Sequence, residues 1–367
     1  MSKAAELAAL IANVNKGSSL ANKNFIINGN MSVAQRATSA TASGDGTYNT
    51  VDRWKTWEAT DGAFTSEQST DAPEGFSNSF KLACTTADTS LASSTYAAFA
   101  QIIEAQNLQS LDYGSSDAKP ITLSFWVKSN KTGTYCTNIE KTDSTLYRYV
   151  KEYTISSADT WEYKTVTILP DSNIQGGAGA IANDNGQGFR VFWSLGHGST
   201  YSGATADSWQ TGSLHTTNNQ VNWMDSTSNT FYITGVQLEI GEKATEFEHE
   251  PIGTTLEKCQ RYYTKFQATS AYSYYGSGVS SATTTARIFK SFPVEMNHIP
   301  VLEQSANNTW NIYPPGAGFT ADATINNASV WGSAINCTTG ASQTANGGCH
   351  VTANNTTNAY FAFESEL

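Results

Sequence analysis

The sequence predicts an all-β protein with more than one domain, and three observations support this fold class. The chain has 367 residues, whereas single domains usually have about 100–200. Charged residues make up 14% and aromatic residues 11%, a composition that excludes a disordered chain. Thr, Ser, Asn, Gly and Tyr are abundant, and they favour short twisted strands and turns over helices.

Three segments alternate apolar and polar residues with the period of a half-buried strand. The segments 121–128 and 189–195 keep this alternation throughout. The segment 231–240 also alternates, but its parity changes after Ile233. A β-bulge at Gly235 is the simplest explanation of this change.

Polar loops, among them the long stretch 196–229, connect these strands, and this arrangement is typical of a β-sandwich. Residues 254–265 lack turn formers and predict a short helix. The last strand, 359–363, is followed by Glu364 and Glu366, which would keep an exposed sheet edge soluble. We therefore expect an N-terminal helix at 1–20, a large β domain at 21–250, a connecting helix or hinge at 251–266, and a smaller β domain at 267–367.

The N-terminal helix carries an apolar stripe. Ala4, Leu7, Ile11 and Val14 have the a/d spacing of a short coiled-coil seam. An isolated helix shorter than about 12–15 residues is marginal in water, so the stripe needs a partner. The stripe either packs on its own domain or mediates self-association or docking to another protein.

The charge balance argues against two classes of partner. Acidic residues outnumber basic ones by 32 to 21, which gives a net charge of −11. Both a nucleic-acid backbone and an anionic membrane surface would repel such a chain. No apolar run reaches the roughly 18 residues that a membrane span requires. We expect neither nucleic-acid binding nor membrane insertion.

The cysteines and the N-terminus suggest that the protein is synthesised in the reducing cytosol. The five cysteines are widely and unequally spaced without a CxxC pair, although Cys337 and Cys349 could still bridge two strands. Glu6 and Asn13 interrupt the Ala/Leu-rich stretch after Lys3, which argues against a signal peptide. A binding module secreted by a bacterium would need such a signal.

Several sequence blocks occur in a characteristic order along residues 24–367. They are NFIINGNM at 24–31, QIIE at 101–104, LSFWVKS at 123–129, YITGVQLEIG at 232–241, CQRYY at 259–263, FPVEM at 292–296 and FESEL at 363–367. In residues and spacing, this series resembles bacteriophage tail fibre and tail appendage proteins, whose N-terminal half is similar to a carbohydrate-binding-module jelly roll.

The resemblance implies a jelly-roll β-sandwich in a structural virion protein. Such proteins are usually homotrimeric, join other tail proteins at one end and are exposed to host surface glycan elsewhere. The resemblance implies a protein made in the host cytoplasm and located in the phage tail, without catalysis or cofactor. A collar, neck or head appendage without receptor contact is the alternative position.

Sugar recognition requires an aromatic face for stacking and polar groups for the hydroxyls. Two regions offer both. The long polar loop contains Trp209, Gln210, His215, Asn222, Trp223 and Asp225, and the start of the second domain contains Tyr272, Tyr274 and Tyr275. Tyr and Trp are also enriched in contacts between subunits, and for both regions we favour such contacts in a trimer over sugar recognition.

Catalytic and metal-binding motifs are not evident in the sequence. The five histidines form no HExxH or HxH spacing, and no GxSxG elbow occurs. Glycan hydrolysis would need only two carboxylates about 5–10 Å apart, so a depolymerase is the alternative function. Glu104, Glu239 and Glu246 are the nearest candidates, but we expect Glu104 and Glu239 to pair with Arg53 or to accept backbone hydrogen bonds. We expect no enzyme and no metal site, although Asn28, Asn30 and Glu239 lie where a structural calcium could bind.

Overall fold

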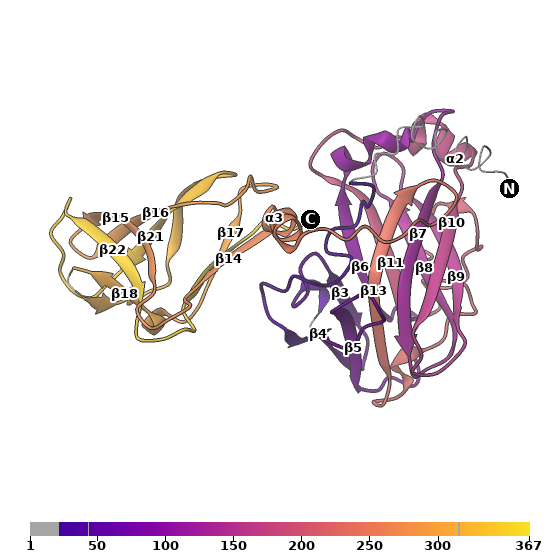
Figure 1. The fold of residues 1–367 in the computed structure, drawn as a ribbon, viewed down its shortest axis with the longest axis horizontal. Coiled ribbons are helices and arrows are strands. Elements are labelled where there is room, and N and C mark those ends of the chain that lie inside the picture. Colours follow the sequence, from indigo (N-terminus) through magenta and orange to yellow (C-terminus); the bar gives the residue numbers. More distant parts are fainter. Residues whose placement is uncertain (1–21, 43, 315) are drawn as a thin grey trace. The chain divides into compact units, whose positions relative to one another are not determined.

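The computed structural model describes residues 22–42, 44–314 and 316–367, and the chain divides into two units (Figure 1). The first unit ends at Thr255 and also includes Leu367, and the second comprises Leu256–Glu366. The expected N-terminal helix with Ala4, Leu7, Ile11 and Val14 lies outside the described residues.

The first unit is a jelly-roll sandwich of two antiparallel sheets, as the sequence predicts. The sheet named here after β13 has the order β1 (Ser39–Thr41), β4 (Ala63–Ser69), β5 (Ser79–Thr86), β13 (Thr230–Ile240), β7 (Ile121–Ser129), β10 (Glu162–Ile168). The sheet named after β11 has the order β12 (Trp209–Gln210), β9 (Tyr147–Ile155), β8 (Gly133–Lys141), β11 (Gln187–His197), β6 (Tyr96–Glu104), β3 (Lys55–Ala59), β2 (Asp45–Tyr48). The short helices η1 (Ala105–Leu111), α2 (Ser172–Gln175), η2 (Gly177–Gly179) and η3 (Trp223–Asp225) lie in the connections.

The core lies between these two sheets. In β11 and β7, alternate apolar side chains face it and are buried, which confirms the alternation predicted for both strands. Trp193 of β11 is at its centre, where its ring stacks on Phe99 with centroids 5.4 Å apart. Trp54 and Phe125 pack against the same indole at 5.5 and 5.7 Å.

Gly235 forms the predicted bulge. The register between β13 and β7 shifts between Thr234 and Gln237, and Gly235 has φ +60°. A Cβ atom at this position would lie 2.7 Å from the ring of Phe76. Glycine is therefore required both by the backbone conformation and by the neighbouring ring.

The second unit also consists of antiparallel sheets. One, named after β23, has the order β14 (Tyr263–Gln267), β23 (Tyr360–Glu364), β17 (Val301–Gln304). The other, named after β15, has the order β19 (Ala317–Gly318), β18 (Trp310–Tyr313), β22 (Gly348–Ala353), β15 (Tyr274–Ala282), β16 (Thr285–Ser291), β21 (Gly332–Thr338), β20 (Thr324–Ser329), and η4 spans Asn307–Thr309. Trp310 and Phe361 stack in the shared core with centroids 4.5 Å apart.

The structure corrects two expectations near the second unit. The helix α3 spans Ile252–Gln260, so the expected helix at 254–265 is too long, because Tyr263 already begins β14. The final strand β23 is not an exposed edge. It pairs with β14 on one side and β17 on the other, and its phenylalanines belong to the core. A strand buried in this way needs hydrogen-bonding partners on both sides.

All five cysteines are buried free thiols, including Cys337 and Cys349. Burial raises the pKa of Cys349, and an uncharged thiol is a poor nucleophile. Within the described ranges, no helix is long and apolar enough to cross a membrane.

Candidate functional site: an aromatic row on the second unit

The tryptophans proposed for sugar stacking in the long polar loop are not at the surface. Trp223 is 0% exposed and packs edge-on against Phe64 in the core. Trp209 is also buried, and its Nε1 donates to the Leu169 carbonyl at 3.0 Å. The loop folds back onto the sandwich because burying two indoles is strongly favourable. Neither ring can stack on a glycan, so this prediction is wrong.

The polar candidates of that loop hold it in place. Gln210 Nε2 donates to the Thr205 carbonyl at 2.7 Å. Asp225 forms an ion pair with Lys131 at 2.6 Å and accepts a hydrogen bond from Asn229 at 2.8 Å. Both side chains therefore stabilise the loop conformation.

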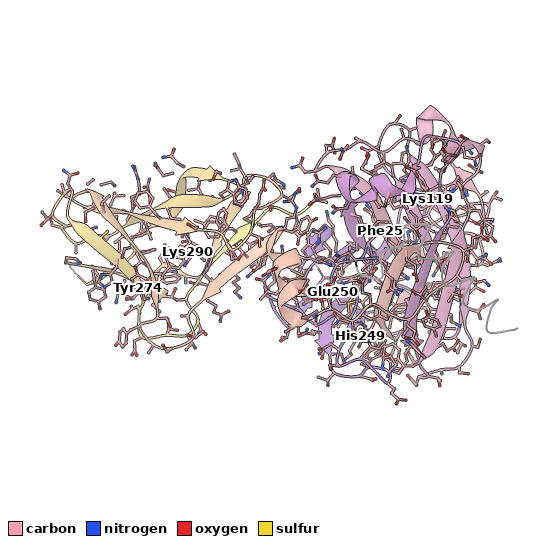
Figure 2. All side chains as sticks on the ribbon, turned by 45° about the horizontal axis from the view of Figure 1, so that its top comes forward. Phe25, Lys119, His249, Glu250, Tyr274 and Lys290 are labelled. Atoms are coloured by element: carbon pink, nitrogen blue, oxygen red, sulfur yellow. The ribbon has the colours of Figure 1, made fainter. Side chains whose placement is uncertain are left out.

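The tyrosine cluster of the second unit separates into a buried and an exposed part. Tyr275 points into the core, where its ring lies 4.6 Å from that of Phe361. Tyr274, labelled in Figure 2, is 63% exposed, and Tyr272 is 56% exposed. Successive residues of a strand point to opposite faces, so only one of the two β15 tyrosines can reach solvent here.

Tyr274 belongs to a row of three rings, here called the aromatic row, with His350 of β22 and Tyr313 of β18. His350 stacks on Tyr313 with centroids 5.6 Å apart and an interplanar angle of 15°. The ring of Tyr274 lies 6.2 Å from His350. Tyr313 and His350 are direct partners in the strand register, so their side chains share one face of the sheet.

The aromatic row lies on the outer face of the β15 sheet. The neighbours of its members, Val351 and Ile312, are buried in the core and therefore point to the other face. On β16, Phe289 is 58% exposed between the buried Ile288 and the half-buried Lys290. The face thus carries exposed rings on more than one strand.

Polar groups accompany these rings. The Tyr274 hydroxyl shares a 2.6 Å hydrogen bond with Ser277 Oγ. Arg287, in register opposite the exposed Val279, donates through Nε to Asn336 Oδ1 at 3.2 Å. Ring faces for the C–H side of a sugar and polar groups for its hydroxyls thus occur on one sheet.

The sequence identified only Tyr274 of the aromatic row. Tyr313 and His350 are far from it along the chain and join it only through the strand order β18, β22, β15. The alternation of Cys349, His350 and Val351 marks His350 as outward-facing, which is the signal that could have found it.

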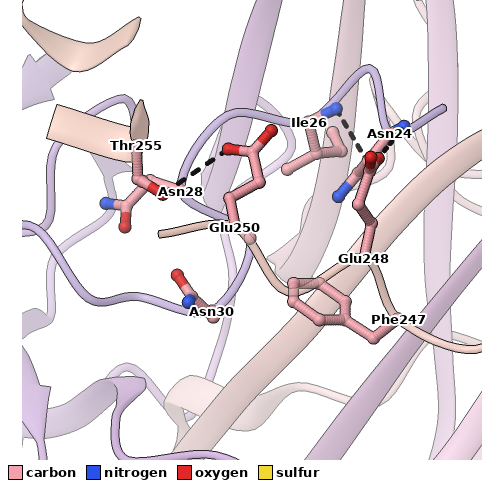
Figure 3. A pocket seen from close by; sticks show the side chains of 9 residues that line it. Asn24, Ile26, Asn28, Asn30, Phe247, Glu248, Glu250 and Thr255 are labelled. Carbon is pink, nitrogen blue, oxygen red and sulfur yellow. Dashed lines mark hydrogen bonds between the residues drawn. The ribbon is translucent and has the colours of Figure 1, made fainter. Parts of the chain in front are cut away.

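A pocket in the first unit, shown in Figure 3, is lined by two of the three residues considered for calcium, Asn28 and Asn30. Its cavity measures about 10 Å³, close to the volume that a single water molecule requires. The Asn28 side chain lines it but donates to the carbonyls of Val33 and Asp52 at 2.9 and 3.0 Å. Glu248 accepts the backbone N–H groups of Lys23 and Asn24 at 2.9 and 3.0 Å. These hydrogen bonds hold the segment that precedes β1 against the sandwich.

The other calcium candidate, Glu239, does not line this pocket. Its carboxylate accepts hydrogen bonds from the Thr245 backbone N–H and side-chain hydroxyl at 2.8 and 2.7 Å. Within the described residues, no three His, Cys, Asp or Glu side chains form a group suited to a metal ion.

The other candidate carboxylates have different environments. Glu104 is completely buried, and its carboxylate accepts a hydrogen bond from the Gln106 side chain. The Glu246 side chain is exposed, while its backbone carbonyl accepts a hydrogen bond from Lys23 Nζ at 2.7 Å.

A larger hollow of about 290 Å³ lies beside η1, lined by Leu108, Gln109, Asp112, Tyr113, Gly114, Ser115 and Ile181. Its only ring, that of Tyr113, is buried against Phe189 and Trp209. The hollow therefore offers no exposed ring face for stacking.

Comparison with known proteins finds similarity at the level of structure. No family model and no curated protein matches the sequence. The structure described as the enzymatically active domain of tailspike protein 4 of bacteriophage CBA120 matches with 14% identity and a TM-score of 0.30, over 60% of this chain. The chain spans only 22% of the length of that structure.

A family 11 carbohydrate-binding module from Clostridium thermocellum, in complex with a β-1,3-1,4-mixed-linked tetrasaccharide, matches with 11% identity and a TM-score of 0.29. This match covers 59% of this chain and 99% of the module. At these identities and TM-scores, the similarities assign no function to the chain.

Proposed function

We propose that this chain is a structural and adhesive subunit of a bacteriophage tail, a fibre or appendage protein, that binds host surface glycan without cleaving it. The observation that carries the binding proposal is the aromatic row on the second unit. Exposed aromatic rings lose water favourably when a sugar ring stacks on them. The three strands that carry the row, β15, β18 and β22, contain no Asp, Glu, Lys or Arg, which suits a neutral glycan.

The tail assignment is supported by the ordered sequence blocks along residues 24–367. On this proposal, the chain forms a homotrimer in the virion, and the segment with Leu7 and Ile11 joins it to other tail proteins. Light scattering of the purified chain should then show an oligomer, and labelled antibody should mark the tail of intact particles. A strictly monomeric protein at all practical concentrations, or labelling at the neck, would contradict this assignment.

Tyr274→Ala should weaken binding to bacterial surface polysaccharide by roughly tenfold, the loss of one stacking ring. Because Tyr274 is largely exposed, the fold should be unaffected. The measurement is binding of the purified full chain to an array of bacterial surface polysaccharides, followed by titration of those that bind.

Tyr163→Ala is the matched control, since this tyrosine of β10 is also exposed but lies in the first unit. It should leave polysaccharide binding unchanged. Equal loss in both variants would contradict the role of the aromatic row. New reducing ends during incubation with the polysaccharide would instead establish a depolymerase.

A further inference from the structure

A second cluster with binding chemistry lies on the β11 sheet of the first unit. Glu140 of β8 is directly opposite Arg148 of β9 and Arg190 of β11 in the strand register. The neighbours of Arg190 along β11, Phe189 and Val191, belong to the core. The three charged side chains therefore share the outer face of the sheet.

The Glu140 carboxylate is nearly inaccessible, with 1% of its side chain exposed, and both of its oxygens are engaged. Arg148 Nε lies 2.8 Å from Oε1, and Arg190 Nη1 lies 3.1 Å from Oε2. His215, from the loop after β12, places its Nδ1 3.2 Å from Oε1.

The cluster carries more positive than negative charge. Two guanidinium groups, which remain charged at all ordinary pH values, face one carboxylate, so one positive charge is left over. The nearby acids are engaged elsewhere. Glu152 accepts hydrogen bonds from Thr217 and Asn219, and Asp207 pairs with Lys151. This surplus is notable in a chain with a net charge of −11.

Arg148 offers hydrogen-bond donors that an outside ligand can reach. Its side chain is only 10% exposed. Among the described residues, Glu140 is its only side-chain partner, through Nε, which leaves the Nη1 and Nη2 donors without a protein acceptor. Neither atom belongs to the buried donors that lack a partner, so both can be reached by water or by an acceptor from outside.

The cluster can be reached from solvent. The Arg190 side chain is 27% exposed, and its guanidinium carbon lies 5.3 Å from the centre of the Trp57 ring in a cation–π contact. The half-buried Tyr201 ring lies 5.5 Å from His215, edge to face. A ligand at the arginines would therefore have an aromatic ring nearby.

We propose that Arg148 and Arg190 bind the carboxylate of an acidic sugar, such as a uronic or sialic acid residue. A guanidinium group matches the planar carboxylate with paired hydrogen bonds. The sugar part of this inference rests on the proposed glycan-binding function, but the chemistry differs from stacking on the aromatic row. The chain then has two glycan contacts, an ionic one on the first unit and a stacking one on the second.

The test is ligand-observed NMR titration of the full chain with N-acetylneuraminic acid, glucuronic acid, glucose and acetate. Both acidic sugars should bind, and glucose and acetate should each bind more weakly than either acidic sugar. Arg148→Gln should weaken acidic-sugar binding about tenfold, the loss of charge-assisted hydrogen bonds. Glu140→Gln should strengthen it, because the competing negative charge is removed. Misfolding cannot produce such a gain.

Lys151→Gln is the matched control, since it removes a positive charge from the same strand outside the cluster. It should leave acidic-sugar binding unchanged, as should Tyr274→Ala. Acidic sugars that bind no better than glucose or acetate would overturn the inference, and so would weaker binding by the Glu140→Gln variant. Either result would leave the polysaccharide binding of the aromatic row untouched, so the two proposals can fail separately.

Discussion

Trp193→Ala is expected to lower the free energy of unfolding of the first unit by about 3–5 kcal/mol, the usual cost of replacing a buried tryptophan by alanine. The indole is completely buried and contacts the rings of Phe99, Trp54 and Phe125. These rings come from both sheets, so the cavity would lie where the sandwich is held together. Urea unfolding followed by circular dichroism measures the change.

Leu169→Ala is the control for this prediction. Its side chain is largely exposed in the same unit, so its replacement should change stability by no more than about 0.5 kcal/mol. A loss below about 1 kcal/mol for Trp193→Ala would show that the packing around this indole contributes little, against the usual cost of such a cavity.

The second large effect is a loss of stability in acid that depends on Glu140. Burial alone would raise the pKa of this carboxyl group, but the contact with His215 and the charges of Arg148 and Arg190 outweigh burial and lower its pKa from 4.5 to about 2. A carboxyl group with a lowered pKa stabilises the folded state above its unfolded pKa. That stabilisation is lost as the pH falls from about 4.5 towards 2, and it amounts to about 3 kcal/mol.

Comparing the native chain with Glu140→Gln over this pH range isolates the contribution of the one carboxyl group. The variant should be less stable at neutral pH, because two arginines lose their counter-charge. Its stability should fall less steeply between pH 4.5 and 2 than that of the native chain. Parallel curves for the two proteins would show that the Glu140 pKa is not lowered by folding.

Much of the fold could be predicted because local patterns of apolar and polar residues determine where the strands lie and which faces they bury. The alternation in β7 and β11 identified both strands and their buried faces, and the change of parity near Ile233 located the bulge at Gly235. Each of these features follows from the period of two along a strand. Strand ends and partners were harder to predict, and β23 was assigned to an edge although it lies between two strands.

The candidate sites, unlike the fold, could hardly be predicted from the sequence. From composition alone, Trp209 and Trp223 were expected on an exposed polar loop. In the structure both rings are buried, because their hydrophobic burial favours packing of the loop against the sandwich. The sequence did not predict the charged cluster of Glu140, Arg148 and Arg190, which lie on three different strands. Only the pairing of those strands brings their charges together.

The sequence by itself determined the all-β class, the strand faces, the bulge and the acidic character, because each depends on neighbours along the chain. The tertiary structure alone decided which rings are exposed and which charges meet, because these depend on strand order and register. The aromatic row and the arginine cluster are both products of antiparallel pairing between distant segments. No local pattern specifies such pairing, since register is set by long-range packing and turn geometry.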